Sequence, residues 1–204
     1  MSETESLVVV IDDDADIRAS LTGLLETVKL RTVTFSSAAE FLASKRHDGP
    51  CCIVLDVRLP GLGGLEFQQQ LRQKQIPTPI IFITGHGDVP MSVQAMKAGA
   101  TEFLTKPIRD QEFLGAVQEA LTSDSLRLEE EREVAELRSR YRSLSAREQQ
   151  VMGLLVAGRV NKQIAGELAV SEVTIRLHRL QVMRKMQVSS LAELIRVADK
   201  MKGS

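Results

Sequence analysis

Four β-branched residues, Val8 to Ile11, are followed directly by three aspartates, Asp12 to Asp14. Such an apolar run is typical of a strand buried inside a parallel sheet. Neighbouring carboxylates repel one another and require a compensating positive charge, which a bound divalent cation commonly supplies. A second apolar run, residues 51–55, ends in the same way on Asp56. Because ligands of open α/β sheets bind at the carboxyl ends of the strands, the two runs predict a shared acidic cleft.

The first 122 residues predict five strands that alternate with helices. Besides the two acidic strands, strand-like runs occupy residues 32–35, 80–84 and 101–105, and apolar side chains at helical spacing fill the intervals. Crossover helices of this length force a parallel, doubly wound sheet, so we expect an α/β domain. Its strand ends bring five polar side chains to one rim: Asp12, Asp13, Asp56, Thr84 and Lys106.

The last part of the chain, residues 143–204, predicts only helices. Ser145 with Glu148 forms a capping box, Asn161 is placed to cap a short helix, and Ser171 is placed to cap a long one. Two helices joined by a short turn, with the second one long and basic, form a helix-turn-helix. We therefore expect an all-α domain of four helices.

Charge is divided unevenly along the chain. Residues 1–122 carry 11 basic and 16 acidic side chains, a net charge of about −5, whereas residues 145–204 carry 10 basic and 5 acidic ones, a net charge of about +5. Such asymmetry suggests an acidic module joined to one that faces nucleic acid.

Residues 123–142 connect the two parts and are rich in Glu and Arg. Val134, Leu137, Tyr141 and Leu144 recur at three- and four-residue spacing, as in the seam of a coiled coil. Two interpretations stay open for this segment. It is either a solvated helix that continues from the last helix of the first domain, or a short helix that pairs with a second copy of itself.

Bulk features exclude several classes of protein. No apolar run approaches the ~18 residues of a membrane span. The acidic start of the chain lacks the basic segment of a signal peptide, so we expect a cytoplasmic protein. The two cysteines, Cys51 and Cys52, are neighbours on a strand whose side chains alternate in direction, which disfavours a disulfide.

In residue type, order and spacing, the first ~120 residues resemble the receiver domain of two-component response regulators. Gly85 to Met91 and Ala95 to Ala100 resemble the FixJ subfamily of the FixJ/NarL family in particular. The resemblance implies that a sensor histidine kinase phosphorylates Asp56 in the presence of Mg²⁺ or Mn²⁺. It also implies the ligands of the metal, which are Asp13, Asp56 and the backbone carbonyl of Arg58, with Asp12 acting through water.

The same resemblance assigns a switch. Lys106 neutralises the phosphoryl oxygens, Thr84 hydrogen-bonds one of them in the active state, and Phe103 turns inward when Thr84 moves. The peptide bond before Pro107 is expected to be cis. Phosphorylation is expected to create a homodimer through the fourth helix, fifth strand and fifth helix. The resemblance further implies that the domain removes its own phosphoryl group but is not a turnover enzyme.

The last ~60 residues resemble the LuxR-type DNA-binding domain. The resemblance is carried by Leu144-Ser145-x-Arg147-Glu148, Asn161-Lys162-x-Ile164-Ala165, Ser171-x-x-Thr174-Ile175 and Met183-x-Lys185-Met186. It implies binding to double-stranded promoter DNA and action on RNA polymerase. The bases would be contacted by Arg176, Leu177, Arg179 and Leu180, and the phosphates by Asn161, Lys162, Ser171, Thr174 and Lys185.

Together these features predict a response regulator that controls transcription, with a receiver domain at 1–122, a helical linker at 123–142 and a helix-turn-helix domain at 143–204. The sequence also leaves three alternatives to compare with this prediction. Asp12-x-Asp14 also fits haloacid-dehalogenase-type phosphatases, although no later acidic pair closes a plausible strand. A receiver that acts through protein contacts alone would lack salt-dependent duplex binding. An autoinducer-binding protein is disfavoured because the first half shows no sign of an aromatic ligand pocket.

Overall fold

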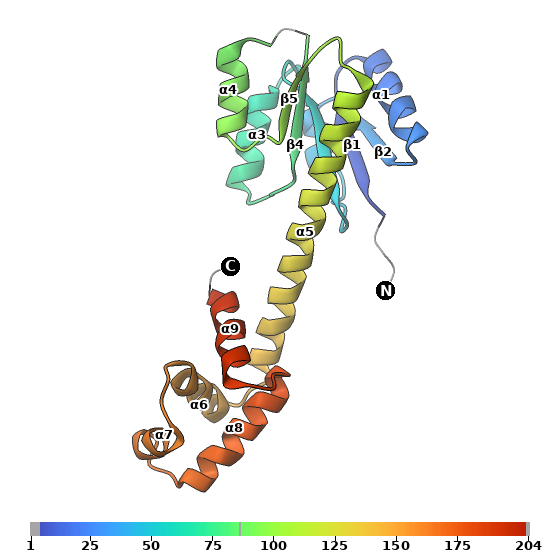
Figure 1. Ribbon diagram of the computed structural model, residues 1–204. Coiled ribbons are helices and arrows are strands. Elements are labelled where there is room, and N and C mark those ends of the chain that lie inside the picture. The colour runs from blue at the N-terminus through green and yellow to red at the C-terminus, as the bar shows by residue number, and fades with distance from the viewer. Residues whose placement is uncertain (1–4, 86, 203–204) are drawn as a thin grey trace. The chain divides into compact units, whose positions relative to one another are not determined.

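The computed structural model describes residues 5–85 and 87–202 (Figure 1). His86, which lies in the segment that resembles the FixJ subfamily, is outside the described residues. The chain divides into two compact units between Leu128 and Glu129, and each unit is described by itself. No helix within the described residues is both long enough and apolar enough to cross a membrane.

The first unit is built on a five-stranded parallel sheet in the order β2-β1-β3-β4-β5. This confirms the expected doubly wound α/β fold. Since β1 and β3 are neighbours in register, with Ile11 opposite Leu55, both strands end at the same level of the sheet. The strands are β1 (Leu7–Ile11), β2 (Arg31–Phe35), β3 (Cys51–Asp56), β4 (Ile80–Thr84) and β5 (Glu102–Thr105).

Helices cover both faces of this sheet (Figure 1). Alternating side chains of β1 divide the core, because successive residues of a strand point to opposite faces. Val8 and Val10 pack with α1 and α5, whereas Val9 and Ile11 pack with α2, α3 and α4. The helices are α1 (Ala15–Thr27), α2 (Ala38–Ala43), α3 (Gly64–Gln73), α4 (Val89–Lys97) and α5 (Asp110–Arg142).

Helix α5 runs without a break from Asp110 to Arg142 and includes the whole of the connector, residues 123–142. The expectation of a helix that continues from the last helix of the first domain is met in this respect. The segment contains no proline, and its only glycine is Gly115, so nothing breaks the helix where the apolar pattern fades. A buried carboxylate fixes the helix to the sheet. Asp124 accepts the backbone N–H of Cys51 at 2.9 Å and pairs with Arg127 at 2.8 Å.

The second unit contains four helices after α5, around one aliphatic core. They are α6 (Ala146–Val156), α7 (Asn161–Glu167), α8 (Glu172–Met186) and α9 (Leu191–Lys202). The Ser145–Glu148 capping box and the cap of α8 at Ser171 are both present, as expected. The prediction that Asn161 caps α7 is wrong. Asn161 is the first residue of the helix, and Val160 precedes it with its N–H held by the Gln163 side chain.

Apolar residues that recur along the connector are buried within the second unit. Val134 and Leu137 are buried, and Leu144 belongs to the core of this unit. Helix α9 runs beside the last turns of α5 (Figure 1), where Lys200 pairs with Glu133 and Arg138 donates to the carbonyl of Met201. Because Val134 and Leu137 are already buried within one chain, the structure favours the interpretation in which this segment continues from the last helix of the first domain.

Candidate functional site

The acidic residues at the ends of β1 and β3 form one cluster. Asp12, Asp13 and Asp56 each place a carboxylate oxygen within 4.8 Å of the other two. Asp12 is fully buried, Asp56 is 8% exposed and Asp13 is exposed. The cluster follows from the sheet order, because β1 and β3 are adjacent and parallel. A group of this kind offers carboxylate oxygens, the ligands that hard divalent cations prefer.

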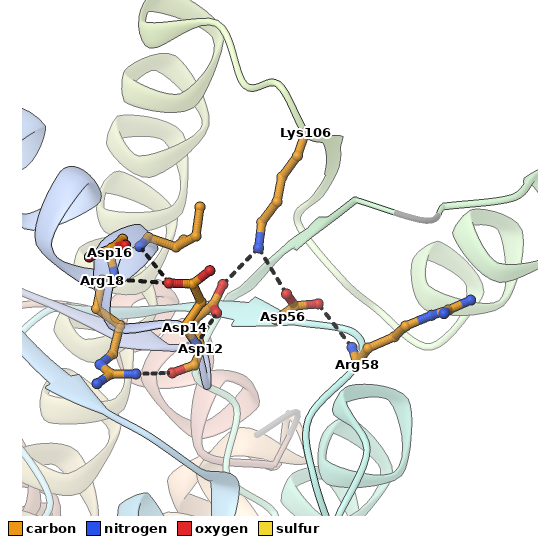
Figure 2. Close-up of polar contacts among 8 residues, drawn as sticks. Asp12, Asp14, Asp16, Arg18, Asp56, Arg58 and Lys106 are labelled. Carbon is orange, nitrogen blue, oxygen red and sulfur yellow. Dashed lines mark hydrogen bonds and ion pairs between the residues drawn. The ribbon is translucent and has the colours of Figure 1, made fainter.

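Lys106 is the cation that reaches this cluster (Figure 2). It follows β5, and its backbone N–H donates to the Thr84 carbonyl at 2.8 Å. Its ammonium donates to Asp12 at 2.8 Å and to Asp56 at 2.9 Å. The Lys106–Pro107 peptide bond is cis, as expected. Burial alone would lower the pKa of Lys106, but the hydrogen bonds and charges of the two aspartates outweigh it and raise the pKa.

Asp12 is held in place from three directions. Its carboxylate accepts the backbone N–H of Asp14 at 2.9 Å as well as the Lys106 ammonium, and its carbonyl accepts Arg18 Nη1 at 2.7 Å (Figure 2). Burial raises the pKa of Asp12, and the hydrogen bonds from Lys106 and Asp14 only partly offset this effect. Three carboxylates face a single ammonium group in this cluster, which fits a site that receives further positive charge.

Asp14 and Arg18 were not among the predicted site residues. Asp14 accepts the N–H groups of Asp16 and Ile17 and so caps α1. This cap turns the chain sharply after β1 and directs Arg18, in the first turns of α1, back towards Asp12. An arginine one helical turn after a capping aspartate was the sequence signal that would have identified it.

One carboxylate oxygen of Asp56 faces Lys106, and the other faces the loop that follows β3. Its Oδ1 accepts the backbone N–H of Arg58 at 2.9 Å (Figure 2). Gly64 permits this loop to pass close to β3, because a Cβ atom there would lie 2.5 Å from the carbonyl oxygen of Asp56. The carboxylate is thus positioned by backbone geometry on one side and by an ammonium group on the other.

Thr84 and Phe103 lie on neighbouring strands at the same edge. Thr84 ends β4 and is buried, and β4 is hydrogen-bonded to both β3 and β5. Phe103, in β5, is half-buried and packs at a ring-centroid distance of 6.1 Å from Phe82. The two side chains meet at Gly87, where a Cβ atom would lie 2.9 Å from Phe103 Cε1 and 3.0 Å from Thr84 Cγ2.

In the second unit, α7 and α8 form the expected helix-turn-helix. The buried face of α8 consists of Ile175, Val182 and Met186. On the exposed face, Leu177 and Leu180 are 61% and 63% exposed, and Arg176 beside them is exposed as well. Exposed leucines of this size are unusual on a helix that also carries basic side chains, and they indicate a contact surface.

The other residues predicted to contact DNA are distributed around this surface. Arg179 is half-buried and Lys162 is exposed. Ser171 accepts the N–H of Thr174 at 3.1 Å and also contacts its hydroxyl, so both serve the start of α8. Asn161 Oδ1 is buried without a hydrogen-bond partner. Lys185 forms an ion pair with Glu148 at 2.7 Å, and its ammonium therefore has a structural partner already.

An acidic sheet edge with a lysine across it, together with a basic helix-turn-helix, defines a two-part signalling regulator. Comparisons with known proteins agree with this class. The response regulator receiver domain matches residues 8–118, and the luxR family of bacterial regulatory proteins matches residues 142–198. The chain belongs to the response regulators with a LuxR-type DNA-binding domain, which are transcription factors and not turnover enzymes. The phosphatase interpretation of Asp12 and Asp14 is therefore wrong.

Relatives resemble the chain over nearly its whole length. Nodulation protein W of Bradyrhizobium diazoefficiens is 51% identical over 97% of this chain and 87% of its own. The transcriptional regulatory protein FixJ of the same organism is 42% identical over 96% of this chain and 95% of its own. The solved structure of the response regulator StyR, 43% identical, has a TM-score of 0.87 and covers 96% of this chain and 99% of that one.

Proposed function

We propose that Asp56 accepts a phosphoryl group from a sensor histidine kinase, and that this reaction controls binding to promoter DNA. The observation that carries the proposal is the placement of Lys106 between Asp12 and Asp56 at the edge of the sheet. A carboxylate oxygen of Asp56 would attack phosphorus, forming a P–O bond while the P–N bond of the kinase phosphohistidine breaks. Lys106 would then stabilise the negative charge on the transferred group.

The cluster fits a divalent cation, Mg²⁺ or Mn²⁺. Three carboxylates lie within 4.8 Å of one another, and the pKa of the buried Asp12 is raised in spite of Lys106. Asp13, Asp56 and the Arg58 carbonyl would hold the ion, with Asp12 acting through water. When bound, the ion neutralises charge on the phosphoryl oxygens during transfer. The same site would support slow removal of the phosphoryl group by water.

The switch would run from Thr84 to Phe103. A phosphoryl group on Asp56 adds hydrogen-bond acceptors beside the end of β4, and the Thr84 hydroxyl would donate to one of them. Phe103 would follow, because it and Thr84 share the space around Gly87. On α4, Val89, Val93 and Met96 are 75%, 44% and 44% exposed. This apolar surface supports dimerisation of phosphorylated chains through α4, β5 and α5.

DNA binding is assigned to α8. Its exposed face carries Arg176, Leu177 and Leu180, and residues 145–204 have an excess of basic side chains. These side chains and Arg179 would contact base edges, while the phosphates would be contacted by Asn161, Lys162, Ser171, Thr174 and Lys185. RNA polymerase is the proposed target of the bound dimer. Regulators of this kind act in the cytoplasm, and we propose that location for this chain.

Beryllofluoride with Mg²⁺ tests the coupling, since it mimics an aspartyl phosphate. The full chain is mixed with genomic fragments, and bound DNA is sequenced with and without beryllofluoride. Enrichment of a roughly two-fold symmetric site, together with a shift from monomer to dimer in ultracentrifugation, is expected. The Asp56→Asn protein should show neither change, whereas Glu26→Gln, an exposed acid on α1 and outside the proposed dimer surface, should behave as wild type. Equal enrichment with and without beryllofluoride would contradict the coupling.

A further inference from the structure

A cavity of about 720 Å³ opens on the first unit, and none of the residues of the acidic cluster lines it. It lies against β2 and the first halves of β1 and β3, on the face on which α2 and α3 pack. On β3 the lining includes Cys51, roughly 17 Å along the strand from Asp56, and on β2 it reaches Phe35, whose carbonyl accepts the Asp12 N–H at 3.3 Å. Nothing in the proposed phosphorylation uses this space, and the sequence pattern gave no sign of it.

The cavity exists because α2 is short. This helix ends at Ala43 after six residues, and residues 44–50 that follow it form neither helix nor strand. Part of the sheet face is therefore left without a helix above it. Val9, Val33, Phe35 and Phe41 line the floor, and the rings of Phe35 and Phe41 meet edge to face at 5.6 Å. The floor is apolar and its volume is in the range of small-molecule sites.

The rim of the cavity is basic. Arg31, Lys45, Arg46 and Lys74 all line it and are exposed, while Asp48 is the one acidic lining residue. Among the described residues, Lys45, Arg46 and Lys74 form no ion pair with a carboxylate. Four cations around an apolar floor complement a molecule that combines an apolar body with one negative charge.

The chain itself shows that a carboxylate reaches this rim. Glu5 lies 3.9 Å from Arg31, and its carbonyl contacts His47 Nε2 at 2.7 Å. Both partners of the Glu5–Arg31 pair are more than half exposed, so the pair contributes little to stability and is easily exchanged for another carboxylate. The Glu5 carboxylate therefore occupies, through a weak ion pair, part of the rim at which the carboxylate of a ligand would bind.

We propose that this cavity binds a small amphipathic monocarboxylate, with its apolar body over Phe35 and Phe41 and its carboxylate at the rim. Lys45 and Arg46, on the segment after α2, would be the principal anion contacts. The ligand would rest on β2 and on the first halves of β1 and β3, the two strands that lead to Asp12 and Asp56. This site is separate from the proposed phosphorylation and does not depend on it.

Decanoate, with the uncharged decan-1-ol as its matched control, tests the proposal. The chain contains no tryptophan, so the Phe41→Trp full-length protein reports on the cavity through a single indole. Decanoate should shift its emission in a saturable manner, at a concentration about tenfold lower than decan-1-ol requires. The Leu126→Trp protein, whose substituted position is exposed on α5, should not respond.

Charge variants separate recognition of the anion from simple partitioning into an apolar surface. Lys45→Gln with Arg46→Gln, in the Phe41→Trp background, should remove most of the preference for decanoate and leave the decan-1-ol response unchanged. Lys97→Gln with Arg109→Gln, two exposed cations elsewhere on this unit, should have no effect. The proposal is overturned if the emission of the Phe41→Trp protein shows no saturable shift below the micellar concentration of decanoate. It is also overturned if Leu126→Trp responds equally. An emission shift that follows protein concentration alone would instead identify a second copy as the occupant.

Discussion

The Nζ atom of Lys106 lies 2.9 Å from the Oδ2 atom of Asp56, although 50 positions separate the two residues in the chain. The same ammonium lies 2.8 Å from the buried carboxylate of Asp12. In the absence of a bound cation, this one lysine compensates the repulsion between the carboxylates of β1 and β3.

Removal of the Lys106 charge should therefore strengthen cation binding. In Lys106→Gln the carboxylates lose an attractive partner at hydrogen-bond distance, so their potential at the cluster becomes more negative. We expect the dissociation constant for Mg²⁺, measured by isothermal titration calorimetry, to fall several-fold. Lys97→Gln on α4 is the control and should leave it unchanged. Weaker Mg²⁺ binding by Lys106→Gln would mean that the lysine does not compete with the ion.

Gly87→Ala should destabilise the first unit. The added Cβ would lie 2.9 Å from Phe103 Cε1 and 3.0 Å from Thr84 Cγ2, so the ring or the loop must move. Overpacking of this kind costs about 1–3 kcal/mol. Urea unfolding followed by circular dichroism measures the loss. Gly85→Ala provides the matched control, because no atom lies within 4 Å of its Cβ position. Equal stability of the two variants would show that Phe103 moves aside freely.

Asp124→Ala should also destabilise the first unit. The buried Asp124 carboxylate accepts the Cys51 N–H and pairs with Arg127, so its removal leaves a part-buried donor and a cation without this partner. The expected loss is about 1–3 kcal/mol in the free energy of unfolding. Glu119→Ala, an exposed acid on the same helix, should change it by less than about 0.5 kcal/mol. Similar losses in both variants would argue against a specific role for the Asp124 contact.

Acid should weaken the second unit through Glu148. The hydrogen bond from Lys185, followed by that from the Ser145 backbone, lowers the pKa of Glu148 in the folded state. A group with a lowered folded pKa contributes stability above its unfolded pKa of about 4.3, and this contribution is lost as pH falls through the folded pKa.

The fluorescence of Tyr141, the only tyrosine, reports on this unit because its ring packs against the core. The urea concentration at the midpoint of unfolding, followed by this signal, should be lower at pH 3 than at pH 5, by about 1 M or less. Glu148→Gln should be less stable at neutral pH and should lose this part of the pH dependence, while Glu172→Gln keeps it. If the urea midpoint of Glu148→Gln fell with pH as steeply as that of the wild type, Glu148 would not be the source of the acid sensitivity.

Sequence patterns predicted the sheet and the convergence of Asp12, Asp13, Asp56 and Lys106, because strand order and parallel direction bring strand ends together whatever the details of packing. The contacts that depend on side-chain reach were not predictable in this way. Arg18 reaches back over one helical turn to the Asp12 carbonyl. Val134 and Leu137 carry a coiled-coil spacing, yet both are buried within one chain, and the neighbouring Glu133 pairs with Lys200 of α9. Periodicity identifies an apolar face but not the partner that covers it.

The central claim is that Asp56 is the acceptor, and intact-mass spectrometry after incubation with acetyl phosphate and Mg²⁺ tests it most directly. The wild-type chain and Asp110→Asn should each gain one phosphoryl group, and chelation of Mg²⁺ should abolish the gain. Asp56→Asn should gain none. A phosphoryl group on the Asp56→Asn protein, at the wild-type level, would contradict the account.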